Sequence, residues 1–287
     1  MDILGKWNKN NYRILKTVGK GNFGTVYKAM DPKENIVAIK MSKELLSISN
    51  EYNGLLKFKN LDFVPRVYDF DDWAKSGETW HFIVMDYIYG ENLKKIMKNG
   101  GLNTRHIFKI GIRLLYIMEQ IHNLGFKYTD IKLENILLTR DGDIYLIDYG
   151  SLIEKDQPTK EYTQVYNINS WNVGYKYSLE KSILFSINMV LISLIGKFEY
   201  NPIQYSLEEL IANVEKFPIK TVEKNFLIRG LKGRFKNFTQ YEDALKILLS
   251  KGKSNRSLDK IDYILIFSIV SFVFIFVFSL KRIFILY

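Results

Sequence analysis

The sequence predicts an α+β fold of two lobes, a small β-rich N-lobe and a larger helical C-lobe, followed by one more helix near the C-terminal end. Strand-like alternation is confined to residues 12–88, whereas apolar residues at helical spacing dominate from 89 to 250. A long uncharged run follows at 263–280. With 287 residues, 47% of them apolar, the chain can bury a sizeable core in each lobe.

The N-lobe is expected to begin with strands in which apolar and polar side chains alternate. Three of them cover residues 12–18, 25–29 and 35–40. A further strand is expected over residues 81–88, before a connection at Gly90.

The C-lobe should contain a long amphipathic helix that begins near Asn103 or Thr104 and ends before Gly125. Its buried face is marked by residues that step by three and four, namely Ile107, Ile110, Leu114, Ile117 and Ile121. Residues 183–195 are apolar on nearly all sides, which predicts a helix inside the core. Two more amphipathic helices are expected, over residues 205–214 and 239–249.

The apolar run at residues 263–280 predicts a single membrane-spanning helix. It carries no charge, is rich in Phe, Ile and Val, and lies between Asp262 and Lys281. A helix of this length reaches about 27 Å, close to the hydrocarbon thickness of a bilayer. The alternative is an element buried in the protein core. Residues 281–287 would form a short tail.

Residues 251–262 are interpreted as a short basic linker. Four Lys or Arg residues lie in it and two follow the apolar run, which places the two lobes on the cytoplasmic side of a membrane under the positive-inside rule. The same cluster can contact anionic headgroups, or it can be a solvated linker with no role at the lipid.

The composition excludes several kinds of site. The formal net charge of +10 fits nucleic acid, an anionic membrane, an acidic partner or a generally Lys-rich surface. No compact basic patch is interleaved with aromatics, so we expect no nucleic-acid partner. The chain has no cysteine, which excludes disulfides and thiolate chemistry, and its three scattered histidines make a zinc site improbable.

Two acids and an amide are spaced as phosphoryl transfer requires. The motif Asp130-Ile-Lys-Leu-Glu-Asn135 is followed thirteen residues later by Asp148-Tyr-Gly150. Hard divalent cations prefer oxygen ligands, which Asn135 and Asp148 can supply. Asp130 stands where a base for the attacking hydroxyl is expected.

A glycine-rich loop, Gly19-Lys-Gly-Asn-Phe-Gly24, lies between the first two predicted strands. Glycines let the backbone approach phosphates and turn successive N–H groups toward them. The dinucleotide-binding version of this motif must lead from a strand into a helix, which is not the order here. Taken alone, the loop can also be a plain glycine-containing hairpin.

These motifs, in this order, resemble the eukaryotic-type protein kinase superfamily over about residues 12–250. The glycine-rich loop, Val37-Ala-Ile-Lys40, the Asp130 motif and the Asp148 motif carry the resemblance. It implies a bilobal protein kinase-like fold, with ATP and Mg²⁺ (Mn²⁺ being possible) as cofactors. The implied reaction transfers the γ-phosphate of ATP to a serine or threonine of a protein substrate, because a lysine two residues after the base is typical of that subgroup.

The resemblance also implies a role for each matching residue. Asp130 would be the catalytic base and Lys132 would neutralise the transferring phosphoryl group, while Asn135 and Asp148 would bind the metal. Lys40 would hold the α- and β-phosphates, with Glu51 as its carboxylate partner. The residues expected to line the ATP site are Gly19, Gly21, Asn22, Phe23, Gly24, Val26, Ala38, Lys40, Glu51, Met85, Asp86 and Ile88.

The chain departs from the family pattern around the catalytic loop. Tyr128-Thr129 replaces the usual His-Arg before Asp130. We therefore expect activity that does not depend on phosphorylation of the activation segment, the stretch that follows Gly150. No Ala-Pro-Glu motif closes that segment; Ser178-Leu179-Glu180 is a candidate remnant, with Glu180 paired to Arg229 or Arg234.

Three interpretations of the resemblance stay open. The chain can be an active kinase, a membrane-anchored pseudokinase that binds nucleotide and serves as a scaffold, or a small-molecule phosphotransferase of the same fold. Pseudokinases commonly lose the counterparts of Lys40, Asp130 or Asp148, and this chain keeps all three. The active kinase is therefore favoured, with no particular protein substrate or oligomeric state predicted.

Overall fold

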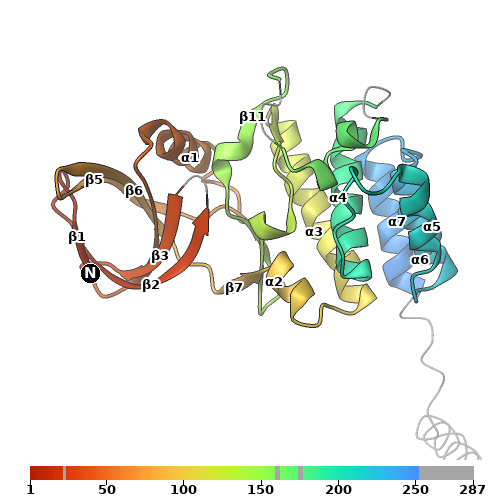
Figure 1. Ribbon diagram of the computed structural model, residues 1–287, viewed down its shortest axis with the longest axis horizontal. Helices are drawn as coiled ribbons and strands as arrows, with labels where there is room; N and C mark the ends of the chain where they lie inside the picture. Colours follow the sequence, from red (N-terminus) through yellow and green to blue (C-terminus); the bar gives the residue numbers. More distant parts are fainter. Residues whose placement is uncertain (22–23, 159–161, 174–176, 252–287) are drawn as a thin grey trace, which may run out of the picture. The chain divides into compact units, whose positions relative to one another are not determined.

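The computed structural model describes residues 1–21, 24–158, 162–173 and 177–251 (Figure 1). The predicted membrane-spanning helix and tail lie outside these residues, as do nearly all of the predicted linker and the positions Asn22 and Phe23. Residues 1–245 form one compact unit. Within it, strands and one helix make up the N-lobe, and the C-lobe is mainly helical.

The N-lobe contains a six-stranded antiparallel sheet with the order β1-β2-β3-β4-β6-β5. Its strands are β1 (Asp2–Leu4), β2 (Asn11–Gly21), β3 (Gly24–Met30), β4 (Ile36–Ser42), β5 (Val67–Lys75) and β6 (Glu78–Asp86). The strands predicted at residues 12–18, 25–29 and 35–40 are confirmed, and the one predicted at 81–88 begins earlier and ends at Asp86. The sheet starts at residue 2, ten residues before the predicted start of the lobe.

Alternation in these strands separates two faces of the sheet. One face forms a closed apolar core from Ile3, Tyr12, Ala29, Val37, Ile39, Met41, Phe82 and Val84. The intervening residues of β4, Ala38 and Lys40, therefore point to the opposite face. Val26 lies opposite Lys40 and Met85 lies opposite Ala38 in the strand register, so these four side chains share that second face.

The N-terminal segment between β1 and β2 connects the two edges of the sheet. The N–H of Lys6 donates to the carbonyl of Asp72 in β5 at 2.8 Å. The buried carboxylate of Asp71 accepts hydrogen bonds from the N–H groups of Trp7 and Asn8. Asp69, also buried, accepts one from the hydroxyl of Tyr12 at 2.6 Å. These contacts satisfy acids that would be costly to bury alone.

Helix α1 (Leu45–Lys57) packs against the sheet through Ile48, Glu51 and Leu55, which are buried. Tyr52 stacks on Phe70 of β5 with ring centroids 4.6 Å apart. The helix therefore rests on the strand that the N-terminal segment secures.

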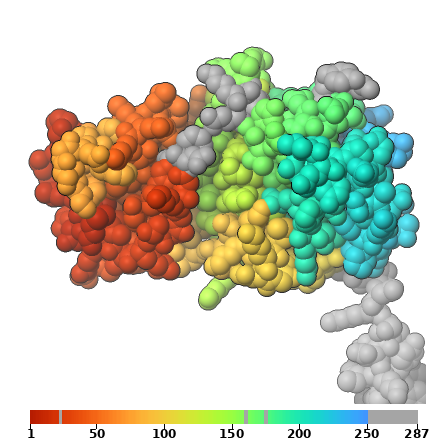
Figure 2. Space-filling model, viewed as in Figure 1, coloured from red at the N-terminus to blue at the C-terminus, as the bar shows by residue number. Residues whose placement is uncertain are grey.

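In the described residues, the C-lobe has six helices and several short strands (Figure 1). The helices are α2 (Leu93–Lys98), α3 (Thr104–Asn123), α4 (Leu179–Gly196), α5 (Leu207–Glu215), α6 (Thr221–Leu231) and α7 (Phe238–Lys251). Strands β7 (Gly90–Asn92), β9 (Ile136–Thr139) and β10 (Ile144–Leu146) form one small sheet, and β8 (Phe126–Tyr128) pairs with β11 (Leu152–Glu154). The 3-10 turns are η1 (Leu133–Asn135), η2 (Tyr149–Ser151), η3 (Gln164–Tyr166) and η4 (Ile168–Trp171). In Figure 2 the red and orange atoms of the N-lobe lie on the left, and the yellow and green atoms of the C-lobe lie to their right.

The predicted helices of this lobe are confirmed. All five residues of the stripe predicted for α3 are buried, and the side chain of Asn103 caps the helix by accepting from the N–H of His106 at 2.9 Å. Helix α4 is long and apolar enough to cross a membrane, with a mean hydropathy of 1.6, but 61% of it is buried inside the fold. Its composition is therefore explained by its place in the core of the lobe.

A close contact joins α4 to α6. The side-chain N–H₂ of Asn188 donates to the carbonyl of Leu227 at 2.8 Å, and Asn188 is completely buried. Gly230 faces this amide, because a Cβ built on Gly230 would lie 2.4 Å from Cγ of Asn188. Only a glycine allows the two helices to approach so closely.

We therefore expect Gly230→Ala to lower the free energy of unfolding by about 1–2 kcal/mol, because overpacking at Asn188 outweighs the gain in helix propensity. Urea unfolding followed by circular dichroism measures this. Asn225→Ala, at an exposed position of the same helix, is the control and should change stability by less than about 0.5 kcal/mol. Equal stability of Gly230→Ala and the parent would contradict the contact described here.

Candidate active site

A buried carboxylate, that of Glu51 in α1, connects the two lobes. Its Oε2 accepts hydrogen bonds from Nζ of Lys40 at 2.8 Å and from the N–H of Gly150 at 3.0 Å. Its Oε1 accepts from the N–H of Tyr149 at 3.1 Å. Glu51 is only 1% exposed, so these three donors replace water around its charge. The structure thus brings together the predicted partners Lys40 and Glu51.

Lys40 holds its charge in this buried place. Burial acts to lower its pKa, but the charges of Glu51 and Asp148 outweigh that effect and raise the pKa above its usual value. The second carboxylate is more distant, with Oδ1 of Asp148 lying 3.8 Å from Nζ of Lys40. The ammonium group of Lys40, on β4, therefore faces the carboxylate of Asp148. It remains available to bind an anion, such as a phosphate group.

The close approach of α1 to the turn η2 depends on Gly54. A Cβ on Gly54 would lie 2.5 Å from the carbonyl oxygen of Tyr149. Tyr149 itself is buried and donates its hydroxyl proton to the carbonyl of Phe63 at 3.0 Å. This bond explains how a tyrosine is accommodated in the Asp148-Tyr-Gly150 motif.

The catalytic loop holds Asp130 with three side-chain donors. Nζ of Lys132 donates to Oδ2 of Asp130, and the amide of Asn135 donates to the same oxygen at 3.1 Å. The hydroxyl of Thr163 donates to Oδ1 at 2.7 Å. Asp130 is 9% exposed, and these three donors fix the direction of its carboxylate. This is the arrangement that a general base needs.

Asn135 and Asp148 fit a magnesium ion by the chemistry of their donor atoms. The amide nitrogen of Asn135 is occupied by Asp130, which leaves its oxygen as the group available to a cation. The backbone N–H of Ile147 donates to the backbone carbonyl of Asn135 at 3.1 Å. This bond holds the neighbouring residue Asp148 near Asn135. Among the described residues, no cluster of three or more His, Cys, Asp or Glu could hold a metal. Phosphate oxygens and water would therefore supply the remaining ligands.

The glycine-rich loop is the hairpin between β2 and β3. Gly21 pairs with Gly24, whose φ of 132° and contact with the carbonyl of Met41 require a glycine. A Cβ on Gly19 or Gly21 would meet no atom of the described residues within 4 Å. The two residues between Gly21 and Gly24 are not described.

The predicted adenine-contacting residues lie where β6 ends. Met85 shares a sheet face with Ala38, Val26 and Lys40, as the strand register requires. The carboxylate of Asp86 accepts from the N–H of Arg66 and from the hydroxyl of Tyr68. These bonds direct the Asp86 side chain toward β5, so any contact it makes with a nucleotide would come from its backbone. Ile88 follows in the connection to β7, where its carbonyl accepts from the N–H of Gly90 at 3.0 Å.

The unusual residues before Asp130 have structural roles of their own. Thr129 donates both its N–H and its hydroxyl to the carbonyl of Ser151, each at 3.0 Å. Lys127 donates its ammonium to the carbonyls of Lys155 and Gln157. The start of the activation segment is thus held through its own backbone carbonyls, which accept from Thr129 and Lys127. Tyr128 is buried, and its hydroxyl has no partner within the described part of the chain.

The expected pairing of Glu180 is wrong for the described residues, because no ion pair there joins it to Arg229 or Arg234. Arg229 instead lies over the ring of Phe235, 4.5 Å from its centroid. Ser182 donates its hydroxyl to the carbonyl of Ser178 within α4.

Sequence reasoning missed Thr163 and Ser151, which contact the two predicted acids. Ser151 donates to Oδ2 of Asp148 at 3.2 Å, and Thr163 reaches Asp130 across 33 residues. The contact of Thr163 has no signature in the local sequence. The position of Ser151 directly after the Asp148 motif was the only available signal.

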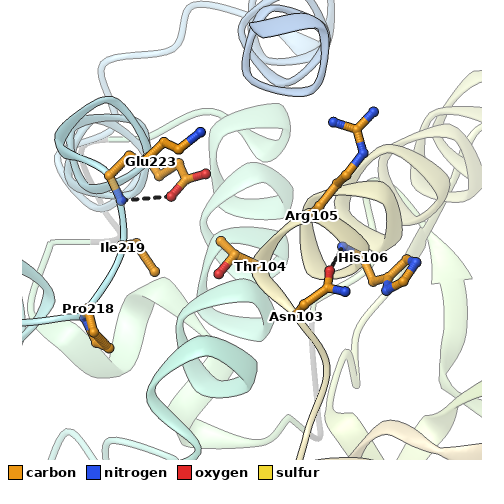
Figure 3. Close-up of a pocket in the computed structure, with 8 residues that line it drawn as sticks. Asn103, Thr104, Arg105, His106, Pro218, Ile219 and Glu223 are labelled. Carbon is orange, nitrogen blue, oxygen red and sulfur yellow. Dashed lines mark hydrogen bonds between the residues drawn. The ribbon is translucent and has the colours of Figure 1, made fainter. Parts of the chain in front are cut away.

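A separate open hollow of about 580 Å³ lies between the starts of α3 and α6 (Figure 3). Its polar groups cap the two helices: Asn103 accepts from the N–H of His106, and Glu223 from the N–H of Lys220. None of the residues predicted for the active site lines it. We therefore do not assign the chemistry to this hollow.

Comparison with known proteins agrees with this geometry. The family model for the protein kinase domain matches residues 12–252. The serine/threonine-protein kinase YabT of Bacillus subtilis is 32% identical over 257 residues, covering 88% of this chain and 74% of the relative. The probable serine/threonine-protein kinase CPE1738 of Clostridium perfringens is 27% identical over 241 residues. That match covers 78% of this chain and 34% of the relative.

The match to the family model spans most of the chain and contains the Lys40, Asp130 and Asp148 motifs. The YabT match covers 88% of the chain, and both matches agree with the two-lobed arrangement described above. The chain therefore belongs to the protein kinase family.

Proposed function

We propose that this protein is a serine/threonine protein kinase that acts on a protein substrate at a membrane. The observation that supports catalysis best is the Glu51 carboxylate, which holds Lys40 and the turn after Asp148 in one buried contact. A pseudokinase does not need both the Glu51 contact and an Asp130 side chain that is held in place by hydrogen bonds. This chain has both.

Transfer would proceed by direct displacement. The oxygen of the acceptor hydroxyl forms a bond to the γ-phosphorus of ATP while the bond from that phosphorus to the β,γ-bridging oxygen breaks. ADP leaves with the electron pair of the broken bond, and the hydroxyl proton passes to the carboxylate of Asp130. The ammonium of Lys132 stabilises the charge on the moving phosphoryl group, and Lys40 holds the nucleotide phosphates. Asn135 and Asp148 would hold Mg²⁺, or Mn²⁺ through the same oxygen atoms, and the bound ion would supply positive charge to the nucleotide phosphates.

Serine or threonine is the proposed acceptor for two reasons. Lys132 follows Asp130 by two residues and contacts its carboxylate. The relatives compared above carry names that describe serine/threonine kinases.

We also propose that activity does not depend on phosphorylation of the activation segment. Lys127 and Thr129 hold the segment by donating to its backbone carbonyls. Thr163, within the segment, donates to Asp130. The residue directly before Asp130 is Thr129, so the arginine that would pair with a phosphate group is missing from that position.

We further propose that residues 263–280 anchor the protein in a membrane, with the kinase domain on the cytoplasmic side. The uncharged run is long enough to span a bilayer, and its basic flank supports this orientation.

Asp130→Ala and Asp148→Ala should each reduce phosphate transfer roughly 10²- to 10⁴-fold, because one removes the base and the other a metal ligand. The assay uses the full chain in detergent with ATP, Mg²⁺ and generic protein acceptors. Asp141→Ala, an exposed acid on the same lobe, is the control and should retain full activity. Transfer that survives both active-site substitutions would refute the mechanism.

Thr163→Val should lower kcat about tenfold, because Asp130 loses a hydrogen bond that fixes its direction. Thr163→Ser keeps the hydroxyl and should retain most of the activity.

Phosphatase treatment of the parent enzyme, checked by mass spectrometry, should leave the rate unchanged. A rate that collapses on dephosphorylation would instead assign the segment a regulatory phosphate.

The full chain should stay in the membrane fraction after washing with high salt or alkali and should be released only by detergent. A variant that ends at residue 262 should be released by the same washes. Recovery of the full chain in the alkaline supernatant would exclude a membrane-spanning helix.

A further inference from the structure

A cluster of charged side chains lies beside the catalytic loop and has no part in the mechanism above. Nζ of Lys94 in α2 contacts Oε2 of Glu199, which follows α4, and lies 3.5 Å from Oε1 of Glu134 in η1. The other oxygen of Glu199 accepts a hydrogen bond from the hydroxyl of Tyr166 at 2.5 Å. One cation therefore lies between two carboxylates contributed by separate segments.

Two segments connect this cluster to the catalytic base. Glu134 follows Asp130 by four residues, so their Cα atoms lie within about 14 Å of each other. Tyr166 follows Thr163 by three residues, and Thr163 donates to Asp130. An extended peptide advances about 3.3 Å per residue, so residues near an acceptor hydroxyl at Asp130 can reach the cluster.

The position of Lys94 is set by its helix. The side chain of Asn92 caps α2 by accepting from the N–H of Lys95 at 2.8 Å, and Leu93 and Met97 are buried. Lys95 points elsewhere and pairs with Glu91 at 2.6 Å. Lys94 is thus the lysine of this helix that faces the two acids.

The cluster is accessible enough to meet a substrate. The Glu134 side chain is 44% exposed, whereas those of Lys94 and Glu199 are 23% and 18% exposed. Two carboxylates without Lys94 would attract a cationic side chain of a substrate. With Lys94 in place, most of that attraction is already satisfied within the chain, and a second cation meets a like charge.

We propose that Lys94 is a specificity-determining residue that fills the Glu134–Glu199 site and selects against lysine or arginine near the phosphorylated hydroxyl. Substrates with uncharged or acidic side chains at that position are accepted. This inference rests on the proposed kinase function and adds a substrate class to it.

The test compares peptides that differ only by Arg or Ala at each position around one acceptor residue. The full chain in detergent should phosphorylate the Arg peptides no better than the Ala peptide. Lys94→Met should favour Arg over Ala by about fivefold in kcat/KM at one or more positions, because two partly exposed carboxylates become free. Lys95→Met is the matched control and should behave as the parent does.

Adding Glu199→Gln to Lys94→Met should reduce the new preference, and Lys94→Arg should not create one. If Lys94→Met does not fold, as judged by its melting temperature, Lys94→Gln replaces it. An Arg preference already present in the parent, or none in an active Lys94→Met enzyme, would overturn the proposal.

Peptide binding separates this inference from the kinase function. Fluorescence anisotropy with labelled Arg and Ala peptides, in the presence of a non-hydrolysable ATP analogue, needs no phosphate transfer. Tighter binding of Arg peptides by Lys94→Met without any transfer would reject the kinase function and retain the role of Lys94. If every variant transfers phosphate, and the preference for Arg over Ala peptides in binding and in kcat/KM is the same as in the parent, only the role of Lys94 is rejected.

Discussion

The rest of the structure depends on one buried charge, the carboxylate of Glu51. It has to be compensated where water is excluded, and its three donors come from β4 and from the turn after Asp148. Removing one partner of a buried ion pair is costly because the other charge stays behind without compensation. The positions of α1, Lys40 and the metal-binding turn are therefore set together, and a change in one of them changes the other two.

The N-lobe provides the support that this contact needs. Helix α1 rests on β5 through the stacked rings of Tyr52 and Phe70, and β5 is secured by the N-terminal segment through its acids. The segment before the kinase motifs is thus part of the lobe, although the match to the family model begins at residue 12. A path of direct contacts leads from Trp7 through β5 and α1 to Glu51.

Local sequence patterns predicted the strands with regular alternation, the amphipathic helices and the order of the motifs. Strand β5 was not predicted because Asp69, Asp71 and Asp72 disturb its alternation. Each of these acids accepts from a donor of the N-terminal region that lies more than fifty residues away in the chain. The contact of Thr163 with Asp130 and the cluster around Lys94 join distant segments in the same way. Such contacts depend on tertiary structure and leave no periodic signal.

The N-terminal segment also changes what the sheet can do with other chains. An edge strand with free backbone groups can accept a strand from another protein. Along the outer edge of β5, the carbonyls of Phe70 and Asp72 already accept from Asn8 and Lys6. Strand addition at this edge would have to displace the protein's own N-terminal segment, which therefore opposes pairing of β5 with a strand of another chain.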